Sequence, residues 1–269
     1  MVCTSCDINL SEKEPVVYVK YYPIEVDSLW GYIDTTGLVV IEPQYDRASE
    51  FSYNLAAVMI DDKWGFINEK GQMVIEPVFE RTRNFTVDFI AATSLDGKYG
   101  FIDNTGTVII DYTFDYVSGF YNGSSVVRKD GKYGVIDIDG EYIIPLVFDH
   151  ANNFYGDQAF VAKEIDGEEY WAIYDRYDSL ITDFDYRPAI YYTGLSEGIS
   201  ATYPLPGFSE DKAPVMINDK KCYINRKGDV VLETDHELIN FFYDGLAYAG
   251  EDGLFGFIDS FGTMRIEPL

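Results

Sequence analysis

The sequence predicts an all-β fold in which tandem repeats of about 34 residues each form a three-stranded antiparallel sheet. The first observation is a recurring phrase: residues 30–46 read WGYIDTTGLVVIEPQYD, and residues 64–80 read WGFINEKGQMVIEPVFE. The second is the regular spacing of its copies, and the third is the absence of helical periodicity from every copy. A fixed period of this kind is typical of proteins whose structural repeats stack on one another.

Seven copies of the phrase are present, and the residue after the leading position is small in each of them. It is Gly31, Gly65, Gly100 and Gly134 in the first four copies, at steps of 34, 35 and 34 residues. It is Ala172, Cys222 and Gly256 in the last three. The leading residues are Trp30, Trp64, Tyr99, Tyr133, Trp171, Lys221 and Phe255. A glycine in mid-strand marks a close approach by another group. We expect an aromatic ring of the neighbouring repeat to lie over it.

Each repeat is expected to begin with an apolar strand, such as residues 55–60 or 125–128. A hairpin turn follows, often Asp-Gly as at residues 96–97 and 130–131, and this dipeptide is a strong hairpin signal. The second strand contains the leading residue and ends in Asp or Asn. Three residues later comes a turn glycine, which is Gly37, Gly71, Gly106, Gly140, Gly228 or Gly262. This Asp-to-Gly spacing is typical of a type I turn.

The third strand is apolar at successive positions, as in residues 39–41, so both of its faces are expected to be buried. Proline follows in four copies, at Pro43, Pro77, Pro145 and Pro268, and we expect it to end the strand. A three-stranded sheet cannot bury both faces alone, so the repeats must stack. A propeller-like ring is the favoured arrangement, and an open β-repeat stack is the alternative.

The predicted domain organisation is an N-terminal lead-in at residues 1–14 and a single β-repeat domain of seven copies at residues 15–269. The step from the fifth to the sixth copy is 50 residues, and the extra length lies in a divergent insertion at residues 186–206. Insertions in repeat proteins often lie on the binding face. Because tyrosine is common at interfaces, we expect Tyr186, Tyr191, Tyr192 and Tyr203 to contact a ligand.

The repeated phrase resembles the bacterial WG-repeat family, also called the KWG-repeat family. The resemblance rests on Lys-Trp-Gly-Phe-Ile-Asn at 63–68, on Lys-Tyr-Gly-Phe-Ile-Asp at 98–103 and on the Phe-Ser-Glu-x-x-Ala-Pro-Val run at 208–215. It covers residues 15–269, with departures in the fifth and sixth copies. The resemblance implies an all-β repeat module that binds another molecule, and it brings no catalytic residues with it.

The composition excludes several classes of partner. The chain has 20 basic and 46 acidic residues, a net charge of −26, so nucleic acid and anionic membrane surfaces repel it. No apolar run has the length of a membrane span. Residues 1–7 lack the basic head and apolar stretch of a secretory signal, and three cysteines do not make a disulfide framework. We therefore expect a cytoplasmic location, no membrane insertion and no nucleic-acid partner.

No catalytic residue, metal site or cofactor is expected. Cys3 and Cys6 lack a second ligand pair for zinc, and neither His150 nor His236 has a nucleophile motif beside it. An aromatic residue closes the repeat at Tyr45, Phe79, Phe114, Phe148 and Phe184, and His236 fills the same slot. The acidic residues that follow, Asp46, Glu80, Asp115, Asp149, Asp185 and Glu237, are interpreted as caps of the turn after the third strand.

These observations favour a non-enzymatic binding module that serves as a rigid β-repeat platform for a protein partner. A carbohydrate- or cell-envelope-binding module is the first alternative, because Tyr and Trp rings stack on sugars where they are exposed. A hydrolase that uses unidentified loop carboxylates is the second alternative.

Overall fold

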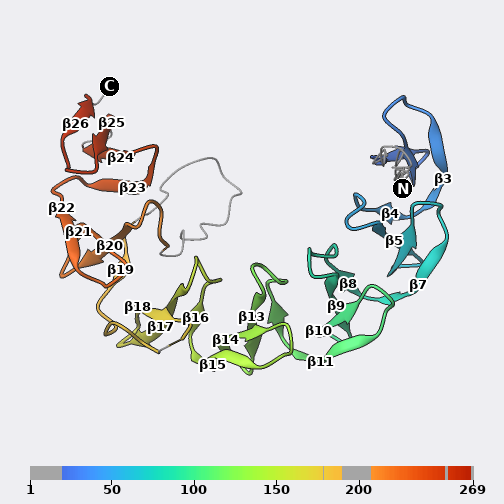
Figure 1. Ribbon diagram of the computed structural model, residues 1–269, viewed down its shortest axis with the longest axis horizontal. Coiled ribbons are helices and arrows are strands. Elements are labelled where there is room, and N and C mark those ends of the chain that lie inside the picture. The colour runs from blue at the N-terminus through green and yellow to red at the C-terminus, as the bar shows by residue number, and fades with distance from the viewer. Residues whose placement is uncertain (1–19, 178, 190–206, 252–253, 268–269) are drawn as a thin grey trace, which may run out of the picture. The chain divides into compact units, whose positions relative to one another are not determined.

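The computed structural model describes residues 20–177, 179–189, 207–251 and 254–267 (Figure 1). All regular secondary structure in these ranges is β, in seven antiparallel sheets of three or four strands. The predicted all-β repeat fold is confirmed, whereas the choice between a ring and an open stack stays a prediction. The chain divides into two compact units, Met1–Phe79 and Glu80–Leu269, here called the N-terminal and C-terminal units.

The N-terminal unit contains two sheets. The first has the order β1-β2-β3 and the second the order β4-β5-β6-β7. Their strands are β1 (Tyr22–Val26), β2 (Leu29–Ile33), β3 (Val39–Tyr45), β4 (Arg47–Ala48), β5 (Leu55–Ile60), β6 (Lys63–Asn68) and β7 (Met73–Phe79).

The C-terminal unit contains five sheets. The first two are formed by β8 (Arg81–Thr82), β9 (Ile90–Leu95), β10 (Lys98–Asp103) and β11 (Val108–Phe114), and by β12 (Tyr116–Val117), β13 (Ser124–Lys129), β14 (Lys132–Asp137) and β15 (Tyr142–Phe148). The third has three strands, β16 (His150–Ala151), β17 (Gln158–Ile165) and β18 (Glu168–Asp175). The last two are formed by β19 (Arg187–Pro188), β20 (Ala213–Ile217), β21 (Lys220–Ile224) and β22 (Val230–Glu233), and by β23 (Leu238–Tyr243), β24 (Leu246–Glu251), β25 (Leu254–Asp259) and β26 (Met264–Ile266).

Both predicted turns are present. Asp96 and Gly97 have φ values of 51° and 73°, and positive φ at both central residues is the mark of the type I′ hairpin. The turn glycines 37, 71, 106, 140, 228 and 262 all have φ between 73° and 88°. In the third repeat, the Asp103 carboxylate accepts the backbone N–H groups of Thr105 and Thr107 at 2.8 and 2.9 Å. Burial alone would raise the pKa of Asp103, but these hydrogen bonds outweigh it and lower the pKa.

The expectation that proline ends the third strand was wrong at Pro43, Pro77 and Pro145, and Pro268 lies outside the described residues. Strand β7 runs through Pro77 to Phe79, and β3 and β15 likewise continue past their prolines. Trp64 of β6 pairs with Phe79 of β7, and Phe66 pairs with Ile75. A step of two residues along β6 therefore corresponds to a step of four residues along β7. The excess forms a bulge in an edge strand, and Pro77 is accommodated there because its missing N–H leaves no ladder bond unmade.

The mid-strand glycine faces this bulge, not a ring of the neighbouring repeat as the sequence suggested. A Cβ added at Gly65 would lie 2.5 Å from the Ile75 carbonyl oxygen and 2.7 Å from the Pro77 nitrogen. Gly31, Gly100 and Gly134 meet the same backbone of their own third strands. Cys222 is tolerated because β21 and β22 pair it directly with Glu233, without the wide bulge. Ala172 lies in a sheet that has no third strand after β18.

Consecutive sheets within each unit share a core. In the N-terminal unit, the Tyr32 ring lies 4.8 Å from the ring of Phe51, and its hydroxyl donates to the Ser49 carbonyl at 2.9 Å. In the C-terminal unit, Tyr223 repeats both contacts, with Phe242 at 4.8 Å and the Asn240 carbonyl at 2.8 Å. Burial raises the pKa of both tyrosines. A phenylalanine beyond the third strand, Phe51 in the β4–β5 loop and Phe242 in β23, therefore ties each of these sheets to the next one.

The recurring acids have a structural role, although they cap a different turn from the predicted one. Asp46, Glu80, Asp115 and Asp149 accept backbone N–H groups from the hairpin that follows in the chain, at 2.9–3.0 Å. Two of these acids also form ion pairs, Lys98 with Asp115 and Lys132 with Asp149. Each lysine lowers the pKa of the carboxyl that it contacts.

Replacing Gly65 by Ala is expected to lower the free energy of unfolding by about 1–3 kcal/mol, because the new Cβ overlaps fixed backbone. The matched control is Gly207→Ala, since a Cβ there meets nothing nearer than 3.9 Å. Its stability should stay within about 0.5 kcal/mol of the native chain. Urea denaturation followed by circular dichroism measures both. Equal losses in the two variants would contradict the bulge contact.

The Asp115 and Asp149 ion pairs predict a defined pH dependence of stability. Their folded pKa values lie below the unfolded value of about 3.9, so their stabilisation is present above that pH and is lost as pH falls through the folded pKa. The Tm of the double variant Asp115→Asn, Asp149→Asn should therefore fall by less than that of the native chain when the pH is lowered from about 5 to about 3. Asp139→Asn, at an exposed carboxyl, is the control and should keep the native slope. The prediction fails if the double variant keeps that slope as well.

Candidate functional site

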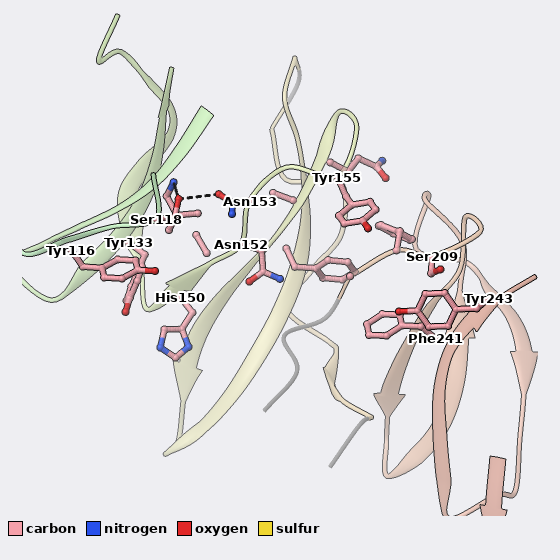
Figure 2. A pocket seen from close by; sticks show the side chains of 17 residues that line it. Tyr116, Ser118, Tyr133, His150, Asn152, Asn153, Tyr155, Ser209, Phe241 and Tyr243 are labelled. Carbon is pink, nitrogen blue, oxygen red and sulfur yellow. Dashed lines mark hydrogen bonds between the residues drawn. The ribbon is translucent and has the colours of Figure 1, made fainter. Parts of the chain in front are cut away.

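Neighbouring sheets of the C-terminal unit enclose a cavity of about 710 Å³, here called the aromatic groove (Figure 2). One wall is formed by Tyr116 and Tyr133 of the β12–β15 sheet. Residues of β16, β17 and the loop between them form the floor. The opposite wall contains Phe208 and the β23 residues Phe241 and Tyr243. The groove therefore depends on side chains from several repeats and not on any single one.

The first wall is held rigidly by strand pairing. Tyr116 pairs with Arg128 in the β12–β13 ladder, and Arg128 pairs with Tyr133 in the β13–β14 ladder. The rings of Tyr116 and Tyr133 lie 6.4 Å apart, and the Arg128 guanidinium lies over the Tyr133 ring at 5.7 Å. Because strands fix the backbone of both tyrosines, their rings are in place before any ligand arrives.

His150 lies next to this wall, on the short strand β16. Its ring meets that of Tyr133 edge to face at 5.1 Å, and its Nδ1 lies 2.5 Å from Glu169 Oε1. The other oxygen of Glu169 accepts the indole N–H of Trp171 at 3.0 Å. The sequence analysis assigns His150 no role, and the structure places it on the groove beside Glu169.

The floor is polar but carries no charge. The Ser118 hydroxyl donates to Asn153 Oδ1 at 3.2 Å, which Figure 2 marks with a dashed line, and Asn152 lies beside them. Gln158 donates its Nε2 to the Arg226 carbonyl at 2.9 Å. The Oε1 of Gln158 is buried and has no hydrogen-bond partner in the described part of the chain. A ligand with an N–H or O–H group would satisfy that acceptor.

Two tyrosines extend into solvent beside the floor and the far wall. Tyr155 is 60% exposed and Tyr243 is 68% exposed. Each follows a phenylalanine that is buried in the core, Phe154 and Phe242 respectively. The backbone below is therefore anchored, while the tyrosine side chain remains free to contact a ligand.

Charged side chains border the groove but do not line it. Among the described residues that line it, none is Asp, Glu, Lys or Arg. Arg226 lies beside Tyr155, whose carbonyl accepts its guanidinium at 3.2 Å, and it is paired with Asp211 at 2.6 Å. Glu169 is paired with His150. In a chain with a net charge of −26, this lining is suited to an uncharged ligand.

The prediction that Tyr186 contacts a ligand was wrong, because this residue is buried. It is 5% exposed, and its hydroxyl donates to the Gly228 carbonyl at 3.2 Å, as Tyr45 does to Gly71 in the first repeat. Tyr186 forms an antiparallel β-bridge with Trp171, as Tyr45 pairs with Trp30 in the first repeat. Tyr186, and not Phe184, is therefore the aromatic residue that closes the fifth repeat. Burial raises its pKa. Tyr191, Tyr192 and Tyr203 lie outside the described residues.

The sequence analysis missed the groove tyrosines, although a signal for them is present. The residue after the loop phenylalanine is a small hydroxyl residue in three repeats and tyrosine in three others. In chain order it is Ser52, Thr86, Tyr121, Tyr155, Ser209 and Tyr243. The three tyrosines are 56–68% exposed. Tyr155 and Tyr243 line the groove, and Tyr121 is not among the lining residues.

Thiol and metal chemistry have few candidates in the described part of the chain. Cys222 is buried, and burial together with nearby Glu233 raises the pKa of its thiol to about 11. Cys3 and Cys6 lie outside the described residues. The described side chains contain no group of three or more His, Cys, Asp or Glu that could hold a metal ion. Nor does any described segment form a helix able to span a membrane.

Because Tyr186 is buried and Tyr155 is exposed, we expect their truncation to change the free energy of unfolding by very different amounts. Tyr186→Ala should cost about 3–5 kcal/mol of unfolding free energy, because it removes a buried ring and leaves a cavity. Tyr155→Ala should change it by less than about 0.5 kcal/mol. Urea denaturation compares the two. A small effect at Tyr186 would restore it as a candidate ligand contact.

Comparison with solved structures shows the fold. A crystal structure of a eukaryotic initiation factor is 12% identical, with a TM-score of 0.51, and the match covers 93% of this chain and 74% of that one. Hsv2 of Kluyveromyces lactis is 11% identical over 89% of both chains, with a TM-score of 0.44. The first likeness supports the fold of repeated antiparallel sheets and says nothing about function.

Sequence comparison identifies the repeats. The comparison with curated proteins finds no match. Four successive segments, at residues 30–64, 64–99, 99–133 and 133–164, match the family model described as "WG containing repeat". Together they span half of the chain, and the protein therefore belongs to the family of WG-repeat proteins.

Proposed function

We propose that this protein is a non-enzymatic binding module, a rigid β-repeat platform that holds a protein partner in the aromatic groove. The observation that carries the proposal is the cluster of exposed tyrosines, Tyr116, Tyr155 and Tyr243, around one uncharged cavity. Tyrosine offers a large contact area and a polar tip, and it loses little conformational entropy on binding. These properties make it a frequent anchor at protein interfaces.

The dimensions of the groove support an anchoring role. A cavity of about 710 Å³ lies within the range of small ligand sites. A stable protein interface buries a larger area, about 800 Å² on each partner. The groove would therefore receive one segment of the partner, and the surrounding surface would contact the rest. Since its wall is fixed by strand ladders, ordering that wall adds little to the cost of binding.

The engagement of the acidic residues supports a role without catalysis. The recurring carboxylates at 46, 80, 115 and 149 are occupied by hairpin N–H groups. The described residues lining the groove include no Asp or Glu, so no pair of carboxylates faces the cavity. A cytoplasmic location, a bacterial origin and the exclusion of nucleic acid by charge stay predictions.

A carbohydrate is the second candidate ligand. The amides of Asn152, Asn153 and Gln158 lie in the same cavity as the tyrosine rings. Amide groups can bond to sugar hydroxyls while the rings stack on the apolar face of the sugar. Quenching of tyrosine fluorescence by neutral glucans would favour this candidate over a protein partner.

The groove variant Tyr155→Ala, Tyr243→Ala is expected to lose the partner, because both substitutions remove exposed anchors without touching the core. Native and variant chains are used as baits in cell lysate, and a protein captured by the native chain alone is purified and titrated directly. We expect its Kd to rise about tenfold or more in the variant, as for interface hot spots.

The control bait is Tyr177→Ala, which removes a tyrosine that is 80% exposed and lies outside the groove. It should bind the partner as the native chain does. A captured protein that binds all three chains equally would contradict the assignment of the groove as its site.

A further inference from the structure

The aromatic groove offers hydrogen-bond donors that have no partner. The hydroxyls of Tyr116, Tyr133, Tyr155 and Tyr243 make no hydrogen bond with any described residue. Each of them can donate to a carbonyl oxygen of a ligand. On the floor, Gln158 Oε1 is a buried acceptor without a partner among the described side chains. The groove is thus matched by a ligand that presents several carbonyl acceptors to the tyrosine hydroxyls and an N–H group to Gln158.

A proline-rich peptide presents carbonyl acceptors of this kind. Proline has a carbonyl acceptor but no backbone N–H, and the polyproline II helix leaves its backbone groups unpaired and open to partners. Proline rings are flat and apolar, and they pack against aromatic side chains in other proline-recognition grooves. An occasional non-proline residue would supply the N–H that Gln158 Oε1 lacks.

The bordering strands argue against the other common modes of peptide binding. Addition of a peptide strand needs a free, regular sheet edge. The edge strands β12 and β16 are two residues long, and the longer edge strand β23 is interrupted by a register shift between Ile239 and Phe242. A docked helix needs a continuous apolar trough. Here the floor carries Asn152, Asn153 and Gln158.

The uncharged lining of the groove further restricts the kind of ligand that it can bind. No described lining residue is Asp, Glu, Lys or Arg, and Arg226 beside the groove is paired with Asp211. A charged ligand group would lose its hydration there without gaining a counter-charge. An uncharged segment avoids that cost.

We propose that the aromatic groove binds an uncharged, proline-rich segment of the partner in the polyproline II conformation. Tyr116 and Tyr133 would contact one end of the segment, and Tyr243 the other. Tyr155 would lie between them, as the arrangement in Figure 2 indicates. This inference rests on the proposed function and specifies the chemistry of the segment that the platform holds.

The test uses the full chain and a fluorescein-labelled nonaproline peptide in fluorescence anisotropy. We expect saturable binding that is weakened about tenfold or more by Tyr155→Ala, Tyr243→Ala, since stacking anchors contribute on this scale. The control Tyr177→Ala should leave the Kd within about twofold of the native value. A labelled Gly-Ser peptide of the same length and a proline peptide interleaved with Glu should not compete.

Three outcomes overturn the inference: no saturable binding to the native chain, equal binding to the groove variant, or stronger binding of a neutral glucan hexamer at the same site. Circular dichroism of the variant excludes misfolding as the cause of any loss. Nonaproline could show no binding while binding of the purified lysate partner still depends on Tyr155 and Tyr243. In that case the proposed function stands, and the inference that the bound segment is proline-rich is rejected. If that partner also binds the groove variant unchanged, the proposed function falls as well.

Discussion

The burial of both faces of a small sheet between its neighbours is the interaction on which the rest of the structure depends. In β14, the successive residues Val135 and Ile136 point to opposite faces, and both are fully buried, in the cores shared with the following and the preceding sheet. A three-stranded sheet cannot achieve this alone, so each repeat needs the next one. The loop phenylalanine, such as Phe51 against Tyr32, completes the core between consecutive sheets. The stacking therefore fixes the position of every loop that follows a third strand.

This packing explains why the groove lies where it does. Once the loop phenylalanine is buried, the next residue is carried to the surface with its backbone already anchored. That position is Ser52 in the N-terminal unit and Tyr155 and Tyr243 in the C-terminal unit, so the chain can vary it without disturbing the core. The same framework thus carries a small hydroxyl residue in some repeats and an exposed tyrosine in others, and Tyr155 and Tyr243 line one cavity.

The features that the sequence predicted well are local. Asp-Gly at 96–97 and the turn glycines require positive φ within a few residues of chain, so the residue types alone reveal them. The approach of bulged backbone to Gly65 depends on strand register, which a list of residue types does not contain. Tyr186 was misassigned because the fifth repeat lacks the turn glycine and the third strand that would have set its register. The groove was missed because it is built from side chains of separate repeats.

The most direct test of the account is whether the groove tyrosines, and not others, sense the ligand. Fluorotyrosine can be incorporated at all 23 tyrosines, and the ¹⁹F resonances of Tyr116, Tyr155 and Tyr243 can be assigned by single Tyr→Phe substitutions. On titration with nonaproline, the account predicts shifts at these three resonances and none at the exposed Tyr177. Unchanged groove resonances at saturation, or shifts centred on tyrosines outside the groove, would contradict it.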